Sequence, residues 1–167
     1  PVALIDLLAG HQLKEAILLA LLKKQVTGKG SHVHVSLFQS AVASLANQAT
    51  NWLIGKQVPR AAGSLHPNIA PYGELFDTKD KQQVTFAIGS NKQFRALCQL
   101  LEYASLASDP HFVSNQQRLV NRQQLYAMLY DRVNSVSFDQ VYQGCLERDI
   151  PMGKIRDLKE VFNLPEG

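Results

Sequence analysis

The segment from Gln12 to Gln25 consists of strong helix formers, and its middle offers almost no polar face. The apolar positions are Leu13, Ala16, Ile17, Leu18, Leu19, Ala20, Leu21 and Leu22. A helix that is apolar on nearly all sides is normally buried on nearly all sides. The pattern therefore predicts a deeply buried helix. The following TGKG (27–30) predicts its end, with Gly28 as the left-handed cap.

An alternating pattern follows at SHVHVSL (31–37), which places Val33, Val35 and Leu37 on one face. Alternation is typical of a β-strand with one buried side. Helical spacing returns over residues 38–55. A helix, a strand and a helix joined by short connections indicate an α/β domain.

The pattern changes at KQVPRAAGSLHPNIAPYG (56–73), which has three prolines, two glycines and little periodicity. Such a stretch predicts an extended linker. Beyond it, residues 74–88 have the pattern of a β-hairpin with a Lys-Asp-Lys turn. Helical patterns cover 92–102, 116–133 and 138–148, and a short further segment ends near residue 163. Residues 74–163 are thus expected to form a small α+β unit.

The composition is that of an ordinary globular protein, because 46% of the 167 residues are hydrophobic and 19% are charged. Apolar runs such as Ala16–Leu22 are much shorter than the roughly 20 residues that span a bilayer. The Pro-Val-Ala start has neither a basic leader nor a cleavage pattern, so we expect no membrane segment and no export. Cys98 and Cys145 stand in amphipathic patterns and are expected to be small buried side chains in a reducing cytoplasm.

Charge is distributed unevenly along the chain. Residues 1–60 carry six Lys or Arg against two Asp or Glu, a net charge of +4, whereas residues 61–167 carry eleven against twelve, a net charge of −1. The basic part suits an anionic, phosphorylated ligand. It has no cluster of Lys or Arg interleaved with aromatic side chains, which argues against nucleic acid as a partner.

Asp6 stands out because ALIDLLAG (3–10) surrounds its carboxylate with apolar residues. One interpretation is a residue near a helix N-terminus, where Asp is common. The other is a catalytic nucleophile or base, since the helix dipole favours a negative charge there while apolar neighbours exclude water. The two interpretations are compatible.

Three other motifs are weaker. GKGS (28–31) lacks the order of a phosphate-binding loop, which needs GxxxxGK[ST] between a strand and a helix. His32 and His34 share the expected strand face, but no third ligand is near them in the sequence, so we expect no metal site. In the linker, His66-Pro67 and Pro71-Tyr72 fit either a stiff crossover or a loop lining a ligand cleft between two domains.

Four separated segments share a further property. They are Asp6 with Gly10, AILLALLKKQVTGKGSHVHVSLFQSAV (16–42), HPNIAPYGELFDTKD (66–80) and DPHFVSNQQRLVNRQQL (109–125). In order and spacing they resemble the family III CoA transferases, the superfamily of formyl-CoA transferase, carnitine-CoA transferase and α-methylacyl-CoA racemase. The distance from Asp6 to TGKG matches the family's distance from its catalytic Asp to TGxG without a gap.

The resemblance implies an α/β (α+β) fold. Residues 1–60 would be part of a Rossmann-like large domain, 61–75 a linker and 76–167 a small α+β domain. Members of the family are more than twice as long and form interlocked dimers. The resemblance therefore implies an internal fragment that lacks most of the CoA pocket, in a homodimer or another homo-oligomer. The apolar helix would need cover from the missing parts, which also favours association.

The resemblance further implies transfer of CoA between an acyl-CoA donor and a small carboxylic acid acceptor. Asp6 would attack the thioester carbonyl, release the CoA thiolate and then carry CoA as an aspartyl thioester to the acceptor. The CoA thioester is here a substrate, and neither a permanently bound cofactor nor a metal is implied. Leu37 matches a position whose side chain packs near CoA, and His66 and Tyr72 are further candidates for contact with the coenzyme.

Two departures from the family bear on the substrate. Formyl-CoA transferases have a run of glycines before the linker, whereas only Gly63 stands in RAAGSLHP, which argues against exchange between formyl-CoA and oxalate. The racemase branch pairs the Asp with a His that would lie upstream of this chain, and His11 is not its equivalent by position.

Three hypotheses therefore remain for the function. The first is a CoA transferase that uses Asp6 as a nucleophile, with the fragment inactive on its own. The second is an acyl-CoA racemase that uses Asp6 as acid and base. The third is a catalytically silent fragment that associates with itself.

Overall fold

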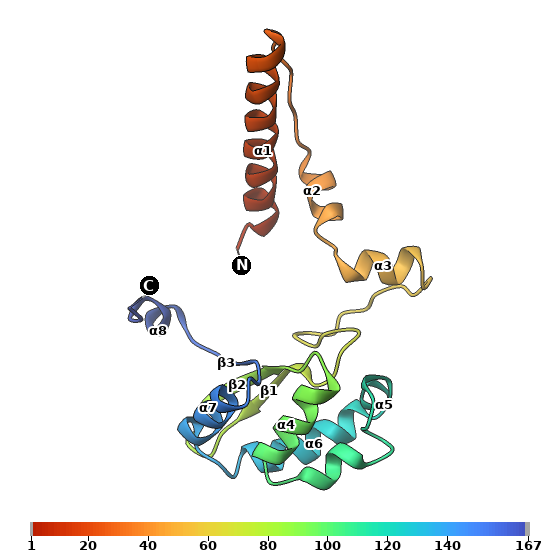
Figure 1. Ribbon diagram of the computed structural model, residues 1–167, viewed down its shortest axis with the longest axis vertical. Helices are drawn as coiled ribbons and strands as arrows, with labels where there is room; N and C mark the ends of the chain where they lie inside the picture. Colours follow the sequence, from red (N-terminus) through yellow and green to blue (C-terminus); the bar gives the residue numbers. More distant parts are fainter. Residues whose placement is uncertain (1, 166–167) are drawn as a thin grey trace. The chain divides into compact units, whose positions relative to one another are not determined.

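The computed structural model describes residues 2–165. The chain divides into two compact units, with the boundary after Ala61. Unit 1 comprises Pro1–Ala61 and unit 2 comprises Ala62–Gly167 (Figure 1). The regular elements of unit 1 are all helices, whereas unit 2 combines a small sheet with helices.

Unit 1 begins with α1 (Leu4–Thr27), which includes the helix predicted from Gln12 and extends it towards the N-terminus. Its C-terminal end confirms the prediction from TGKG. Gly28 has a φ of 71°, and its N–H donates a 2.7 Å hydrogen bond to the Lys24 carbonyl. Glycine adopts this left-handed conformation without strain and so satisfies a carbonyl of the last turn.

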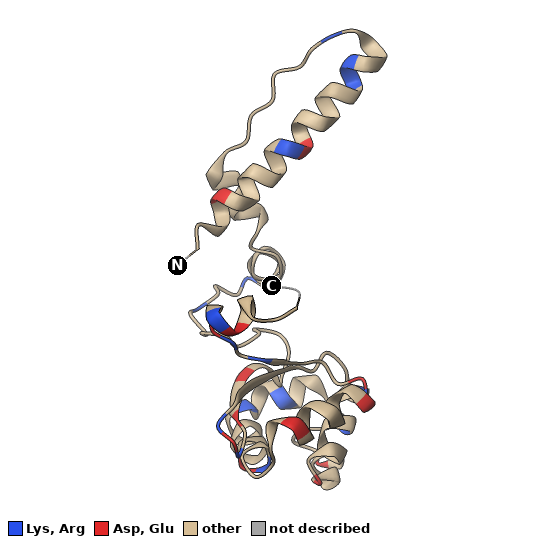
Figure 2. Ribbon diagram, turned by 90° about the vertical axis from the view of Figure 1, so that its left-hand side faces the viewer, with Lys and Arg blue, Asp and Glu red and all other residues tan. Residues whose placement is uncertain are grey.

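The predicted burial of α1 is wrong for this chain. None of its residues is buried, and it exposes a series of large aliphatic side chains: Leu4, Leu7, Leu13, Ile17, Leu18, Leu19, Leu21, Leu22 and Val26. Figure 2 shows how few charged residues the helix carries. Within unit 1, α1 packs against α2 (Leu37–Ala43), where the Ser40 hydroxyl donates to Oε1 of Gln12 at 2.8 Å. One short helix covers too little of a surface that is apolar all round.

The predicted strand at 31–37 is also wrong. Residues 29–36 form no helix or strand, and α2 begins at Leu37. A β-strand needs a neighbour for its backbone hydrogen bonds. The part of the chain that the structure describes contains a single sheet, and this segment does not belong to it. The alternating residues therefore lack the partner strands that their pattern requires.

The predicted helix over 38–55 divides into α2 and α3 (Asn47–Leu53). Ser36 caps α2, because its hydroxyl oxygen accepts a hydrogen bond from the Gln39 N–H. The break falls at Ala46, whose φ of 49° lies in the left-handed region that a continuous helix excludes. Helical periodicity does not mark this break, since Ala is itself a strong helix former.

Unit 2 contains a three-stranded antiparallel sheet in the order β1 (Tyr72–Asp77), β2 (Gln83–Ala87) and β3 (Met152–Lys154). The hairpin predicted at 74–88 is confirmed by β1 and β2, in which Phe76 lies opposite Val84. The third strand was not expected from the sequence, because three residues are too few to show alternation.

Three helices of unit 2 lie on one side of this sheet (Figure 1): α4 (Asn91–Leu100), α6 (Arg122–Val133) and α7 (Phe138–Glu147). The remaining short elements are the 3-10 helix η1 (Ala104–Ser108), α5 (Asn115–Val120) and α8 (Leu158–Phe162). The helices predicted at 92–102 and 138–148 are confirmed, whereas the one at 116–133 divides at Asn121 into α5 and α6. Within residues 2–165, no helix is both long and apolar enough to cross a membrane.

The core of unit 2 lies between the sheet and these helices. Phe76 of β1 and Phe86 of β2 are buried with their ring centroids 5.4 Å apart. Leu97 of α4, Leu129 of α6 and Val141 of α7 complete the centre of the same buried cluster. Because the sheet packs against this core, it fixes the position of β1 and of the end of the loop that leads into it.

Candidate functional site

Asp6 is the third residue of α1, and it is exposed. It lies in an open depression of about 300 Å³, lined by Asp6, Leu7, Gly10, His11 and Lys14. The expected exclusion of water from Asp6 is therefore wrong for this chain. Its apolar neighbours in the sequence project around a helix that is itself exposed, so they do not enclose the carboxylate.

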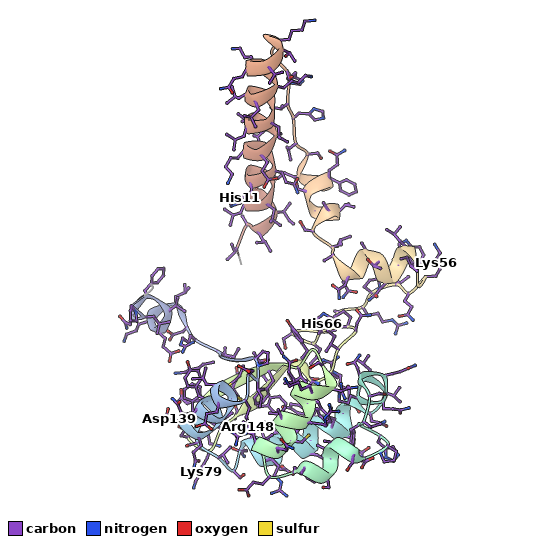
Figure 3. The ribbon with its side chains drawn as sticks, in the orientation of Figure 1. His11, Lys56, His66, Lys79, Asp139 and Arg148 are labelled. Atoms are coloured by element: carbon purple, nitrogen blue, oxygen red, sulfur yellow. The ribbon has the colours of Figure 1, made fainter. Side chains whose placement is uncertain are left out.

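The Asp6 carboxylate is accessible for chemistry. Among residues 2–165, none of the ion pairs involves Asp6. Its place in the first turn exposes it to the positive end of the α1 dipole. His11, labelled in Figure 3, and Lys14 lie along the same depression, with Lys14 Nζ 3.2 Å from Nδ1 of His11. An accessible carboxylate can act as a nucleophile towards an activated carbonyl carbon.

Leu37 does not lie on the apolar face of a strand, contrary to expectation, because α2 begins with this residue and the strand is absent. Its side chain is 54% exposed. The nearby rings of His32 and His34 are stacked with their centroids 5.9 Å apart. In the described part of the chain, no group of three or more His, Cys, Asp or Glu could hold a metal ion.

His66 and Tyr72 come together in unit 2, where His66 lies on the loop before β1 (Figure 3). Their ring centroids are 4.9 Å apart, and the His66 N–H donates to the Tyr72 carbonyl at 2.9 Å. Nδ1 of His66 accepts a hydrogen bond from the Asn68 N–H at 3.1 Å. The neutral ring therefore carries its proton on Nε2, which can donate to a ligand.

Side chains of α5 form hydrogen bonds with the backbone of the loop before β1. Oδ1 of Asn115 accepts from the Ala70 N–H at 3.1 Å, and its Nδ2 donates to the Asn68 carbonyl at 2.8 Å. Arg118 donates from Nε to the Ala70 carbonyl at 2.7 Å. Three peptide groups of the loop are thus satisfied by two side chains.

Arg118 is buried, with only 1% of its surface exposed. Its other nitrogens donate to the Phe112 carbonyl and to Oδ1 of Asn91, each at 2.9 Å. The guanidinium also lies 4.4 Å from the centre of the Phe94 ring. Desolvation by burial lowers the pKa of Arg118, since it penalises the charged form. The residue connects the loop, α4 and α5 from inside unit 2.

Arg122 fastens both ends of the same loop. It donates to the carbonyls of His66 at 2.7 Å and of Tyr72 at 3.0 Å. Its Nε donates to Oε1 of Glu74 at 2.6 Å, in an ion pair that is largely buried. The conformation that presents His66 and Tyr72 therefore depends on Arg122.

Sequence reasoning missed the roles of Asn115, Arg118 and Arg122. All three lie in DPHFVSNQQRLVNRQQL, one of the segments that carry the family resemblance, but the pattern there predicts only a helix. The local pattern gave no signal for the two arginines, because Arg118 lies on α5 and Arg122 begins α6, which the periodicity presents as one helix. Their acceptors are carbonyls some 50 residues earlier in the chain, which local patterns do not reveal.

Cys98 and Cys145 are both free and buried. Burial raises the pKa of each thiol to about 12. Since the thiolate is the reactive form of cysteine, neither residue is a nucleophile at neutral pH.

Comparison with known proteins adds a family match over the whole sequence. The model of CoA-transferase family III matches residues 1–167. Human succinyl-CoA:glutarate CoA-transferase is 33% identical over 168 residues, and acetyl-CoA:oxalate CoA-transferase of Acetobacter aceti is 32% identical over 164 residues. These alignments cover 99% and 98% of this chain but only 37% and 42% of the two relatives. The chain thus spans about two fifths of the length of these curated relatives.

Comparison with solved structures also finds proteins that match almost the whole chain. A CAIB/BAIF family protein from Brucella suis superposes with a TM-score of 0.73 at 35% sequence identity, over 99% of this chain and 43% of that protein. Rv3272 from Mycobacterium tuberculosis superposes with a TM-score of 0.83 at 24% identity, over 99% of this chain and 42% of that protein. The second likeness concerns the fold alone.

Proposed function

Because the chain belongs to CoA-transferase family III, we propose that the whole protein moves CoA from an acyl-CoA donor to a carboxylic acid acceptor. The observation that carries this proposal is the match of the family model over all 167 residues. The resemblance in the segments around Asp6, His66 and Asn115 supports it as well.

In the proposed reaction, Asp6 is the covalent nucleophile. Its carboxylate attacks the thioester carbonyl, the C–S bond breaks, and a mixed anhydride and a CoA thiolate result. The thiolate then attacks the Asp6 carbonyl carbon, which releases the donor acid and leaves an aspartyl-CoA thioester. The acceptor carboxylate repeats these two steps in the reverse sense, and Asp6 is regenerated as the new acyl-CoA leaves. Covalent catalysis divides a difficult acyl exchange into easier steps.

For the substrates, we propose a dicarboxylic acid acceptor with a short-chain acyl-CoA donor. The human and Acetobacter relatives are named for succinyl-CoA with glutarate and for acetyl-CoA with oxalate. The net charge of +4 over residues 1–60 favours anionic substrates. The lone Gly63 argues against formyl-CoA as the donor.

Three further residues are proposed to contact CoA. Leu37 is assigned to the neighbourhood of the coenzyme by the resemblance, and its exposed side chain is free to make such a contact. His66 and Tyr72 are assigned to the same role because they form one pair on a firmly held loop. Nε2 of His66 would donate to a carbonyl or phosphate oxygen.

We propose that the 167-residue chain on its own is inactive and associates with itself as a homodimer or larger homo-oligomer. The exposed aliphatic surface of α1 supports association, because contiguous apolar patches of this kind drive it. Since both cysteines are free thiols, we place the protein in a reducing cytoplasm.

The test uses the full-length protein that contains this chain. It is incubated with succinyl-CoA or acetyl-CoA and analysed by intact mass and peptide mapping, with Asp6→Asn as the control. We expect a hydroxylamine-sensitive adduct on Asp6 and none on the variant. If solvent deuterium instead enters the acyl α-carbon with no adduct, the protein is a racemase. Absence of both signals contradicts any catalytic role for Asp6.

A further inference from the structure

The loop that carries His66 and Tyr72 closes on itself at its base. The Ser64 hydroxyl donates to the Gly73 carbonyl at 2.7 Å, and the His66 N–H donates to the Tyr72 carbonyl at 2.9 Å. Gly73 has a φ of 89°, and a Cβ at this position would overlap the Ser64 carbonyl oxygen. The base of the loop is therefore too narrow for a residue other than glycine.

Arg122 of α6 spans this base with three different nitrogens. Nη1 donates to the His66 carbonyl at 2.7 Å and Nη2 to the Tyr72 carbonyl at 3.0 Å, while Nε donates to Oε1 of Glu74 at 2.6 Å. The guanidinium is planar and rigid, so its two Nη atoms fix the positions of the two carbonyls relative to each other. The side chains of Glu74 and Arg122 are only 5% and 17% exposed, so the ion pair that orients the guanidinium is largely shielded from water.

The two carbonyls that Arg122 fixes belong to the two residues whose rings pair. The centroids of the His66 and Tyr72 rings are 4.9 Å apart, and Nδ1 of His66 accepts from the Asn68 N–H at 3.1 Å. The His66 ring is thus held by its neighbours, and Nε2 is the nitrogen that can donate to a ligand. A group that is ordered before its ligand arrives avoids the free-energy cost of ordering on binding. Arg122 can therefore affect affinity without touching the ligand.

We propose that Arg122 is a positioning residue for coenzyme binding, because it orders the loop so that Nε2 of His66 is in place before CoA arrives. Arg122 acts through His66 and takes no part in the chemistry at Asp6. The inference rests on the proposed contact between His66 and CoA, and it adds the residue on which that contact depends. A lysine in place of Arg122 keeps the positive charge but lacks the rigid pair of Nη donors.

The test measures the Kd of free CoA for the full-length protein that contains this chain, by isothermal titration calorimetry. The variants are Arg122→Lys, His66→Ala and the double variant, and Arg95→Lys is the matched control, because Arg95 is exposed on α4. We expect Arg122→Lys to weaken CoA binding roughly three- to tenfold and the control to leave it unchanged. The double variant should bind no more weakly than His66→Ala alone, because the effects of two residues that act as one unit do not add.

The cycle separates failure of this inference from failure of the proposed His66 contact. If His66→Ala weakens CoA binding and Arg122→Lys does not, the inference is overturned while the contact stands. If the losses from the two substitutions add, Arg122 acts independently of His66, and the inference is again overturned. If His66→Ala binds CoA as tightly as wild type, the proposed contact itself is wrong, and Arg122 has no ligand-binding ring to position.

Glu74→Gln replaces Arg122→Lys in the same cycle if the lysine variant does not fold. Glutamine keeps an acceptor for Nε of Arg122 but removes the charge that orients the guanidinium. We expect weaker CoA binding in Glu74→Gln, with no further loss when it is combined with His66→Ala. A Kd equal to that of wild type, or an additive loss in the combination, would overturn the inference.

Discussion

In unit 2, Phe76, Leu97 and Leu129 are completely buried, whereas in unit 1 no residue of α1 is buried, although α1 is more apolar than α4 or α6. The α1 sequence is nevertheless helical from Leu4 to Thr27. Helix formation follows from residues near one another in the sequence, whereas burial requires packing partners. The difference indicates that the apolar side chains of α1 need packing partners that unit 1 does not provide.

The curated relatives are consistent with this view, since the chain spans only about two fifths of their length.

The two units also differ in how their loops are held. Arg118 and Arg122 fix the loop before β1 through several hydrogen bonds. In unit 1, the Ser40 hydroxyl of α2 donates a hydrogen bond to Gln12 of α1.

The largest effect should come from paired truncations in the two units. Phe76→Ala should lower the free energy of unfolding of unit 2 by about 3–5 kcal/mol, because it leaves a cavity in the core. Leu22→Ala, at a position 59% exposed on α1, should change the stability of the monomer by no more than about 0.5 kcal/mol, at a protein concentration where sedimentation shows no association. Urea denaturation followed by far-UV circular dichroism measures both.

The control is Leu146→Ala, at an exposed position in unit 2, which should behave like Leu22→Ala. A large loss in Leu22→Ala would contradict the contrast between the units, because it would mean that α1 is buried in the protein in solution. At higher protein concentration, where the proposed self-association would cover α1, Leu22→Ala should weaken that association, and sedimentation measures this.

The next effect concerns the buried guanidinium. Arg118→Ala removes the donors of the Ala70 and Phe112 carbonyls and of Oδ1 of Asn91. Buried acceptors without donors are unfavourable, so unit 2 should lose about 2–4 kcal/mol of stability. Arg118→Lys keeps the charge but not the fork of donors, and it should recover only part of the loss. A full recovery by lysine would contradict a role for the hydrogen-bond geometry.

The elements that could be predicted from the sequence depend on residues close together in the chain. The β1–β2 hairpin is one case, since alternation and a polar turn are both local. The end of α1 is another, because Gly28 alone indicates a left-handed cap. In both cases the physical cause lies within a few residues.

The elements that could not be predicted depend on distant partners. Residues 31–37 alternate like a strand but have no neighbouring strand in the described chain. The three-residue strand β3 exists because β2 offers it an edge. Among the candidate site residues, the resemblance pointed to Asp6, but only the structure shows that Asp6 is exposed. The hydrogen bond from Arg122 to the His66 carbonyl joins two residues that are 56 positions apart in the sequence, so no local pattern predicts it.

A smaller effect is expected at the end of α1. Gly28→Ala places a Cβ on a residue with a φ of 71°, which should destabilise the helix end by about 1 kcal/mol. Nothing lies within 4 Å of the added atom, so backbone strain is the only cause. Gly30→Ala is the matched control, because Gly30 has no positive φ. Hydrogen exchange of the residue 28 N–H measures the difference, and equal protection in the two variants would contradict it.

The smallest effect is a pH dependence in the turn of the hairpin. The hydrogen bond from the Thr78 hydroxyl, and then the one from the Phe138 N–H, lower the pKa of Asp80 from its ordinary 3.8. A carboxyl group whose pKa is depressed by folding stabilises the native state above its unfolded pKa, and this stability is lost as the pH falls through the folded pKa. Asp80→Asn should therefore have a lower urea midpoint than wild type for unit 2 at pH 7. The two midpoints should converge as the pH falls below 3.8, where wild type loses the charge of Asp80. Thr78→Val removes the larger cause and should reproduce part of the same pH dependence. A difference in urea midpoint between wild type and Asp80→Asn that stays constant from pH 7 down through the folded pKa would contradict this prediction, because it would show that the Asp80 charge does not stabilise unit 2. The stability of unit 2 would then rest on its core and on buried Arg118.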